Sequence, residues 1–176
     1  MNGADPAMAG NDRRRSSTRA LGWALAWALV FTAAHGYWYG GGRWGLGDAP
    51  SPLPGWPRSL IGWIFTIVVV GMFAAGIAIP IVLLRCHIHG RGRSMLIALL
   101  WIGCGILVLR GASGLLDDVV RDLGLSDRGI TGLTYQDTLG TADPSTGTRI
   151  STAAIDAYFL LGGGLFGWAT QRSKAR

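Results

Sequence analysis

Three ionisable side chains interrupt or end long apolar stretches of this 176-residue chain: His35, Arg110 and Asp156. A histidine exchanges protons near neutral pH, whereas an arginine and a carboxylate form a charge-assisted pair. Ionisable groups inside apolar spans are rare, and they are usually paired or functional. These residues are therefore the candidate polar cluster, and they suit either a salt bridge that fixes helix order or a site for a ligand or a proton.

The depth of the three residues links them. At 1.5 Å of helix rise per residue, each lies roughly 20 to 24 Å from the inner end of its own apolar stretch. An unpaired carboxylate at that depth is costly, so the shared level predicts mutual pairing. We expect Asp156 to pair with Arg110, with His35 hydrogen-bonded alongside. Independent snorkelling of each side chain to the membrane interface is the remaining alternative.

Four apolar stretches position these residues. Apolar residues make up 49% of the chain and charged residues only 15%, against about 25% charged residues in an average soluble domain. A run of about 20 apolar residues crosses a bilayer as a helix. The predicted spans are 20–39, 59–84, 94–112 and 151–169. The fold class that follows is all-α, an antiparallel bundle of four transmembrane helices within residues 20–170.

The basic residues predict the orientation of these spans. With the N-terminus inside, the inner segments carry ten basic residues against two aspartates, and the outer segments carry six against seven. This is the positive-inside pattern, so we expect both termini in the cytoplasm and a multi-pass protein of the cell membrane. The inner face is expected to contact anionic lipid headgroups, and nucleic acid is not an expected partner.

The two ends of the chain are expected to be tails. Residues 1–19 are small, polar and basic, which predicts a disordered cytoplasmic segment. Residues 171–176 form a short basic tail on the same side. A basic start followed by an apolar run is also compatible with a cleaved signal peptide. The apolar run continues through aromatic residues that make poor cleavage neighbours, so a retained helix is favoured.

Aromatic residues gather at the outer end of the first two spans. They are Tyr37, Trp38, Tyr39, Trp44, Trp56 and Trp63. Trp and Tyr favour the headgroup region, because the ring is apolar and its N–H or O–H seeks water. We expect an aromatic belt, with an aromatic ligand platform as the alternative. The connection 113–150 is expected to be a long outer loop. The amphipathic, helical spacing of its first residues indicates either an extension of the third helix or a helix lying in the interface.

The other reactive residue types form no recognisable catalytic or metal motif. The run Cys86-His87-Ile88-His89 matches no usual zinc spacing, and two arginines that disfavour a cation follow it. We therefore predict no metal and no cofactor. In the last span, Gly163 and Gly167 form a small-x-x-x-small pair, which lets helices approach closely. This pair predicts helix packing, within the bundle or in a homo-oligomer.

The end of the first span carries a resemblance. The run His35-Gly36-Tyr37-Trp38-Tyr39-Gly40-Gly41 resembles the His-x-x-Trp-x-x-Gly-Gly signature of a domain-of-unknown-function family of small four-helix bacterial membrane proteins. Arg110 and Asp156-Ala157-Tyr158 look like other recurring positions of that family. The resemblance implies the same four-helix topology and the same polar residues. It implies no reaction, because the family has no established activity.

Three classes of function stay open. A structural or accessory membrane protein is favoured, because no motif indicates a reaction. A small transporter or channel protomer needs a polar path, yet the second span carries no charge between residues 61 and 84. An enzyme that uses His35 and Asp156 as acid and base on a lipid or quinone needs a pocket open to the outer leaflet. A filled bundle favours the first class, a continuous passage the second and a lateral apolar pocket the third.

Overall fold

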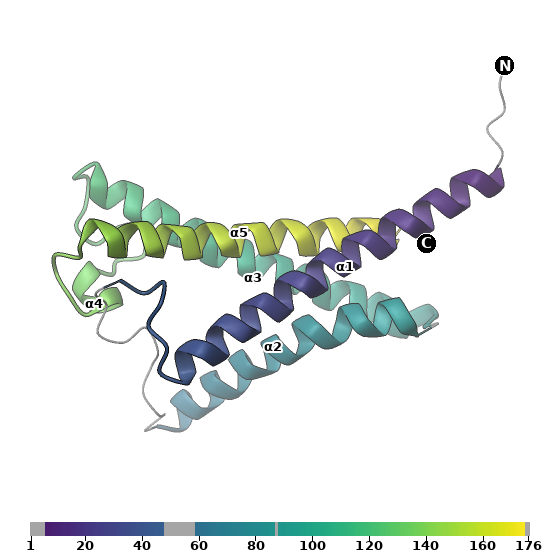
Figure 1. The fold of residues 1–176 in the computed structure, drawn as a ribbon, viewed down its shortest axis with the longest axis horizontal. Helices are drawn as coiled ribbons and strands as arrows, with labels where there is room; N and C mark the ends of the chain where they lie inside the picture. The colour runs from purple at the N-terminus through teal and green to yellow at the C-terminus, as the bar shows by residue number, and fades with distance from the viewer. Residues whose placement is uncertain (1–5, 48–58, 87, 175–176) are drawn as a thin grey trace, which may run out of the picture.

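The computed structural model describes residues 6–47, 59–86 and 88–174. These residues form helices and no strand, which confirms the predicted all-helical class (Figure 1). The helices are α1 (Pro6–Tyr39), α2 (Leu60–Arg85), α3 (Gly90–Asp122), α4 (Tyr135–Leu139) and α5 (Thr146–Lys174). The four long helices alternate in direction, so the start of α1 and the end of α5 lie at the same end of the bundle (Figure 1).

Three helices are long and apolar enough to cross a membrane, namely α2, α3 and α5. The sequence predicted four such spans. The stretch 20–39 forms the second half of α1, but this helix does not meet the same measure. The reason is its composition, because glycine, tryptophan, tyrosine and His35 are interspersed among its alanine and leucine side chains.

Two helix boundaries differ from the prediction. Residues 1–19 were expected to be disordered, yet α1 begins at Pro6; proline suits the first turn of a helix, and the residues that follow it contain no second proline to break the helix. Residues 113–150 were expected to form an outer loop, but the first of them belong to α3, which continues to Asp122. Leucine and valine keep their helical spacing up to that point, and Gly124 then adopts a left-handed backbone with φ 65°.

Helices α3 and α5 form the closest pair in the bundle. On α5, a Cβ added at Gly163 would lie 3.1 Å from the Val108 nitrogen, and one at Gly167 would lie 3.2 Å from the Cys104 sulfur. On α3, a Cβ at Gly111 would lie 2.5 Å from the Asp156 carbonyl oxygen. Glycine on both helices therefore allows backbone approach that any larger residue would prevent.

Helix α1 joins this pair through a reciprocal contact with α5. The Trp27 indole N–H donates to the Tyr158 carbonyl at 3.1 Å, and the Tyr158 hydroxyl donates to the Trp27 carbonyl at 3.3 Å. The two rings stack with centroids 5.2 Å apart. Trp27 also covers Gly162, where an added Cβ would overlap the indole ring. These contacts fix α1 against α5 at mid-length.

Helix α2 is the least enclosed of the long helices. It packs on α1 and touches α3 less extensively. The end of α2 and the start of α3 lie close together, and these two helices then diverge toward the opposite end of the bundle (Figure 1). The space between the diverging α2 and α3, called the wedge below, is part of a cavity that residues of all four long helices line.

Candidate functional site

The predicted charge pair is present in the structure. The Arg110 Nη1 atom lies 2.6 Å from the Asp156 Oδ1 atom. The Asp156 side chain is 1% exposed, whereas that of Arg110 is 50% exposed. Gly114 on α3 makes this burial possible, because an added Cβ there would overlap the Asp156 carboxylate. The pair therefore joins α3 to α5, with the carboxylate inside and part of the guanidinium accessible.

His35 does not join this pair. Its Nδ1 atom lies 2.9 Å from the Phe31 carbonyl oxygen, one turn earlier on α1. The imidazole packs between rings, with centroid distances of 4.1 Å to Phe31, 5.0 Å to Phe73 and 5.1 Å to Trp38. The described hydrogen bond of His35 is therefore to a residue of its own helix, and not to the charge pair as expected.

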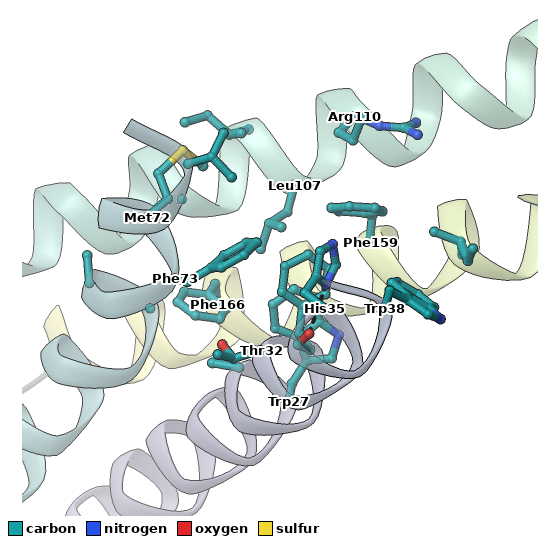
Figure 2. Close-up of a pocket in the computed structure, with 18 of the residues that line it drawn as sticks. Trp27, Thr32, His35, Trp38, Met72, Phe73, Leu107, Arg110, Phe159 and Phe166 are labelled. Atoms are coloured by element: carbon teal, nitrogen blue, oxygen red, sulfur yellow. Dashed lines mark hydrogen bonds between the residues drawn. The ribbon is translucent and has the colours of Figure 1, made fainter. Parts of the chain in front are cut away.

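His35 and Arg110 instead line a common cavity. Its volume is about 730 Å³, which lies within the usual range for small-molecule sites. All four long helices contribute walls, as Figure 2 shows. The labelled residues are Trp27, Thr32, His35 and Trp38 from α1, Met72 and Phe73 from α2, Leu107 and Arg110 from α3, and Phe159 and Phe166 from α5. Asp156 is not part of the lining.

The cavity opens through the wedge between α2 and α3. Several of its lining residues on these helices are exposed apolar side chains: Val68, Met72, Leu99, Ile102 and Ile106. Leu46, from the segment after α1, and Leu139, from α4, line it near the connecting loops. A ligand therefore has an apolar entrance along the side of the bundle.

Polar atoms in the cavity are few. A carbonyl oxygen only accepts hydrogen bonds, so the contact with Phe31 requires the proton on His35 Nδ1 and leaves Nε2 as an acceptor in the neutral ring. Arg110 uses Nη1 on Asp156 and lies with its Cζ atom 5.2 Å from the Phe159 ring centre. The Thr32 hydroxyl is buried without a hydrogen-bond partner among the described residues. The lining thus offers an acceptor, a cation and several hydroxyls among apolar walls, the others being those of Tyr39, Thr138, Ser151 and Thr152.

The aromatic residues predicted as a belt have two kinds of position. Tyr37, Tyr39, Trp44 and Trp63 are exposed, as a belt requires. Trp38 and Tyr39 line the cavity, and the Trp38 indole N–H donates to the Trp44 carbonyl at 3.0 Å. The sixth residue, Trp56, lies outside the described residues.

A second polar cluster holds the segment after α3. Asp117 accepts hydrogen bonds from the Ile130 nitrogen at 2.6 Å and the Thr131 nitrogen at 2.9 Å. Arg121 donates to the Leu133 carbonyl at 2.6 Å and lies 4.5 Å from the Tyr135 ring centre. The cluster fixes the chain that leads into α4, which in turn contributes to the cavity wall.

The short helix α4 is fixed by a capping box. The Thr134 side chain accepts from the Asp137 nitrogen at 3.2 Å, and the Asp137 carboxylate accepts from the Thr134 nitrogen at 2.9 Å. The Thr134 hydroxyl also donates to the Asp137 carboxylate at 2.7 Å. The bonds that the carboxylate accepts from the Thr134 backbone and side chain lower the pKa of Asp137 below its usual value. The carboxylate is therefore ionised whenever the cap is formed at neutral pH.

Sequence reasoning missed the residues that shape the cavity, chiefly Trp27, Phe31, Phe73 and Phe159. A signal was present in α1, because Trp27, Phe31 and His35 follow each other at intervals of four residues. This spacing places three rings on one helix face. No comparable pattern marks the single Phe73 of α2 or Phe159 of α5.

The described residues contain no group of three or more His, Cys, Asp or Glu side chains placed to hold a metal ion. His87, part of the run considered for metal binding, lies outside them.

Comparison of the chain with protein-family models, with curated proteins and with solved structures finds no match. The geometry of the cavity is therefore the observation that indicates a function.

Proposed function

We propose that this is an integral membrane protein that crosses the membrane four times, with both termini in the cytoplasm. Three helices qualify as spans by themselves. Helix α1 lies against two of them, and its bonds to Tyr158 tie its middle to α5. A helix that contributes Leu21, Trp27 and Phe31 to the same apolar core enters the bilayer with its partners. The exposed apolar side chains of α2 then face acyl chains.

The basic residues support the proposed orientation. Arg14, Arg15 and Arg19 lie in the first half of α1, and Arg93 lies in the first turn of α3. Figure 1 places the start of α1 and the end of α5 at one end of the bundle. Arg93 also donates to the Ser173 carbonyl at 2.5 Å, near the end of α5. We propose that this end binds anionic headgroups of the inner leaflet.

Within that setting, the favoured function is an accessory one, the binding of a membrane-soluble ligand in the lateral cavity. The single observation that carries it is a space of about 730 Å³ that opens between α2 and α3 and has a few polar groups. A purely structural bundle would fill this space, because helices pack to crystal-like density. A lateral entrance suits a molecule that arrives from the bilayer.

The observations support ligand binding better than they support catalysis in which His35 and Asp156 act as acid and base. That reaction required His35 and Asp156 to act on one substrate. Asp156 is buried against Gly114, is paired with Arg110 and lies outside the cavity lining. His35 has no carboxylate partner among its described contacts. The proposed role is therefore to hold a ligand.

The test is mass spectrometry of molecules that co-purify with the full-length protein in mild detergent. Gly103 lines the cavity, and a Cβ there would lie 3.8 Å from Phe166, so Gly103→Leu extends into the space. Gly105 is exposed on the same helix with nothing near its Cβ, and Gly105→Leu is the matched control. We expect one bound apolar molecule in the wild type and in Gly105→Leu, and its loss in Gly103→Leu. Equal lipid content in all three proteins would overturn the proposal.

A further inference from the structure

We infer that the ligand is an isoprenoid quinol, a flat ring with hydroxyl groups and a long apolar tail. This inference rests on the proposed function and specifies the class of ligand for the same cavity. Three observations carry it: the aromatic walls around the polar groups, the hydrogen-bonding state of His35, and the charge balance at Arg110.

The polar groups of the cavity lie among rings. His35 packs against Phe31, Phe73 and Trp38, as described above. Phe31 and Phe159 meet edge to face at 5.2 Å, and Phe159 lies between His35 and Arg110 in Figure 2. Offset and edge-to-face contacts recognise a flat conjugated ring. A glycerol-based headgroup gains nothing from such walls.

The state of His35 selects a hydrogen-bond donor. Because Nδ1–H is used on the Phe31 carbonyl, the neutral imidazole presents Nε2 as an acceptor. A quinol hydroxyl donates to such a nitrogen, whereas a quinone carbonyl, which only accepts, does not. The guanidinium of Arg110 keeps donors beyond the one on Asp156 and suits a second oxygen of the same ring.

The charge balance selects a neutral head. Asp156 compensates the charge of Arg110 at 2.6 Å. An anionic headgroup at Arg110 would have to approach this carboxylate or displace it from its partner, and both are costly in an apolar site. A neutral ring meets neither penalty. The tail then follows the apolar wall formed by residues such as Ile79, Leu99 and Phe166, and leaves through the opening between α2 and α3.

The experiment is equilibrium dialysis of ubiquinol and ubiquinone with one isoprene unit, without oxygen, against the full-length protein in phosphatidylcholine nanodiscs. Empty nanodiscs give the partition background. We expect saturable binding, with the quinol bound about tenfold more tightly than the quinone at neutral pH, the worth of one hydrogen bond. His35→Phe keeps a ring but removes the acceptor, and it should lose the preference for the quinol. His89→Phe, at an exposed position before α3, should keep it.

A further variant separates loss of the acceptor from loss of the fold. His35→Gln restores an accepting oxygen and should regain part of the preference. Equal affinity for the two forms in the wild type, or an unchanged preference in His35→Phe, would overturn the inference. If neither form binds saturably while a lipid still co-purifies in a Gly103-dependent manner, the ligand class is wrong and the proposed function stands. If co-purification is also independent of Gly103, both fail.

Discussion

At the residue scale, the Asp156 carboxylate is the most demanding group in the molecule. It is almost fully buried, and Arg110 provides its compensating partner from α3. The half-exposed guanidinium tolerates this position because it keeps access to the surface. The bond therefore neutralises a buried charge and fixes the register of α3 against α5.

Removing Arg110 should leave this carboxylate without its ion-pair partner. We predict that Arg110→Ala lowers the free energy of unfolding in detergent by about 1 to 3 kcal/mol, the usual cost of an orphaned buried acceptor. The double variant Arg110→Ala with Asp156→Asn should recover part of this loss, because no charge remains. Denaturant titration followed by circular dichroism measures both. A double variant less stable than Arg110→Ala would contradict this explanation.

Gly114 should be as important as either charged residue. A Cβ at this position overlaps the Asp156 carboxylate, so we predict that Gly114→Ala destabilises the protein by about 1 to 3 kcal/mol. Gly105→Ala, where nothing lies near the new methyl group, should instead stabilise α3 by about 0.5 to 1 kcal/mol. The same unfolding titration compares the two, and changes of the same sign would contradict the packing described.

The sequence predicted the charge pair but not the position of His35. The common depth of these residues on their helices was sufficient to predict that Arg110 and Asp156 pair. It carried no information on helix rotation or on local alternatives. The Phe31 carbonyl satisfies His35 from within α1, and aromatic rings surround the imidazole. The role of Gly114 could not be predicted from the sequence either, because it depends on where α5 crosses α3.

At the element scale, the extension of α3 organises the chain before α4. Asp117 and Arg121 lie one turn apart and bind backbone groups at residues 130, 131 and 133. The amphipathic spacing after residue 112 indicated either an extension of the third helix or a separate helix in the interface, and the structure shows α3 continuing to Asp122. The loop atoms that these side chains bind were not predictable, because they depend on glycine turns such as Gly129 and Gly132, whose φ angles are positive.

Neutralising Asp117 should release this segment without disturbing the bundle. Asp117→Asn keeps the shape but weakens hydrogen bonds to the Ile130 and Thr131 nitrogens, which are stronger to a charged acceptor. We predict faster amide hydrogen exchange in residues 126–134 and unchanged exchange in the middle of α3 and α5. Asp127→Asn, at an exposed loop position, is the control. Faster exchange throughout α5 would show that the cluster supports the bundle itself.

The cap of α4 should respond to acid. The folded pKa of Asp137 is lowered by its bonds from Thr134, so the cap contributes fully above the usual value of 3.8. That contribution is lost as pH falls through the lower folded value. We predict that exchange of residues 135–139, corrected for its intrinsic pH dependence, is constant from pH 5 to 8 and rises below pH 4. Asp137→Asn should remove the transition, and a transition near neutral pH would contradict the assignment.

At the scale of the whole molecule, the divergence of α2 from α3 creates the cavity. The sequence predicted the helical class and the antiparallel order, since apolar length and basic flanks are local properties. It did not predict the wedge, because crossing angles depend on the combined shapes of four helix faces. The contact between Trp27 and Gly162 is one such determinant, since it sets how closely α1 approaches α5.

The proposed topology requires that α1 crosses the membrane together with α2, α3 and α5. The direct measurement is labelling of single cysteines with a membrane-impermeant maleimide, in intact cells and after lysis, in a Cys104→Ser background. Native Cys86 is exposed at the proposed inner end. Trp44→Cys and Gln136→Cys, each made with Cys86→Ser, report on exposed positions at the proposed outer end.

If all four helices cross, both outer cysteines react in intact cells, whereas Cys86 reacts only after lysis. Arg15→Cys, made with Cys86→Ser at an exposed position in the first half of α1, should likewise react only after lysis. Labelling of both Arg15→Cys and Trp44→Cys in intact cells would place the two ends of α1 on the same side of the bilayer. That result would leave three crossings and contradict the four-helix account.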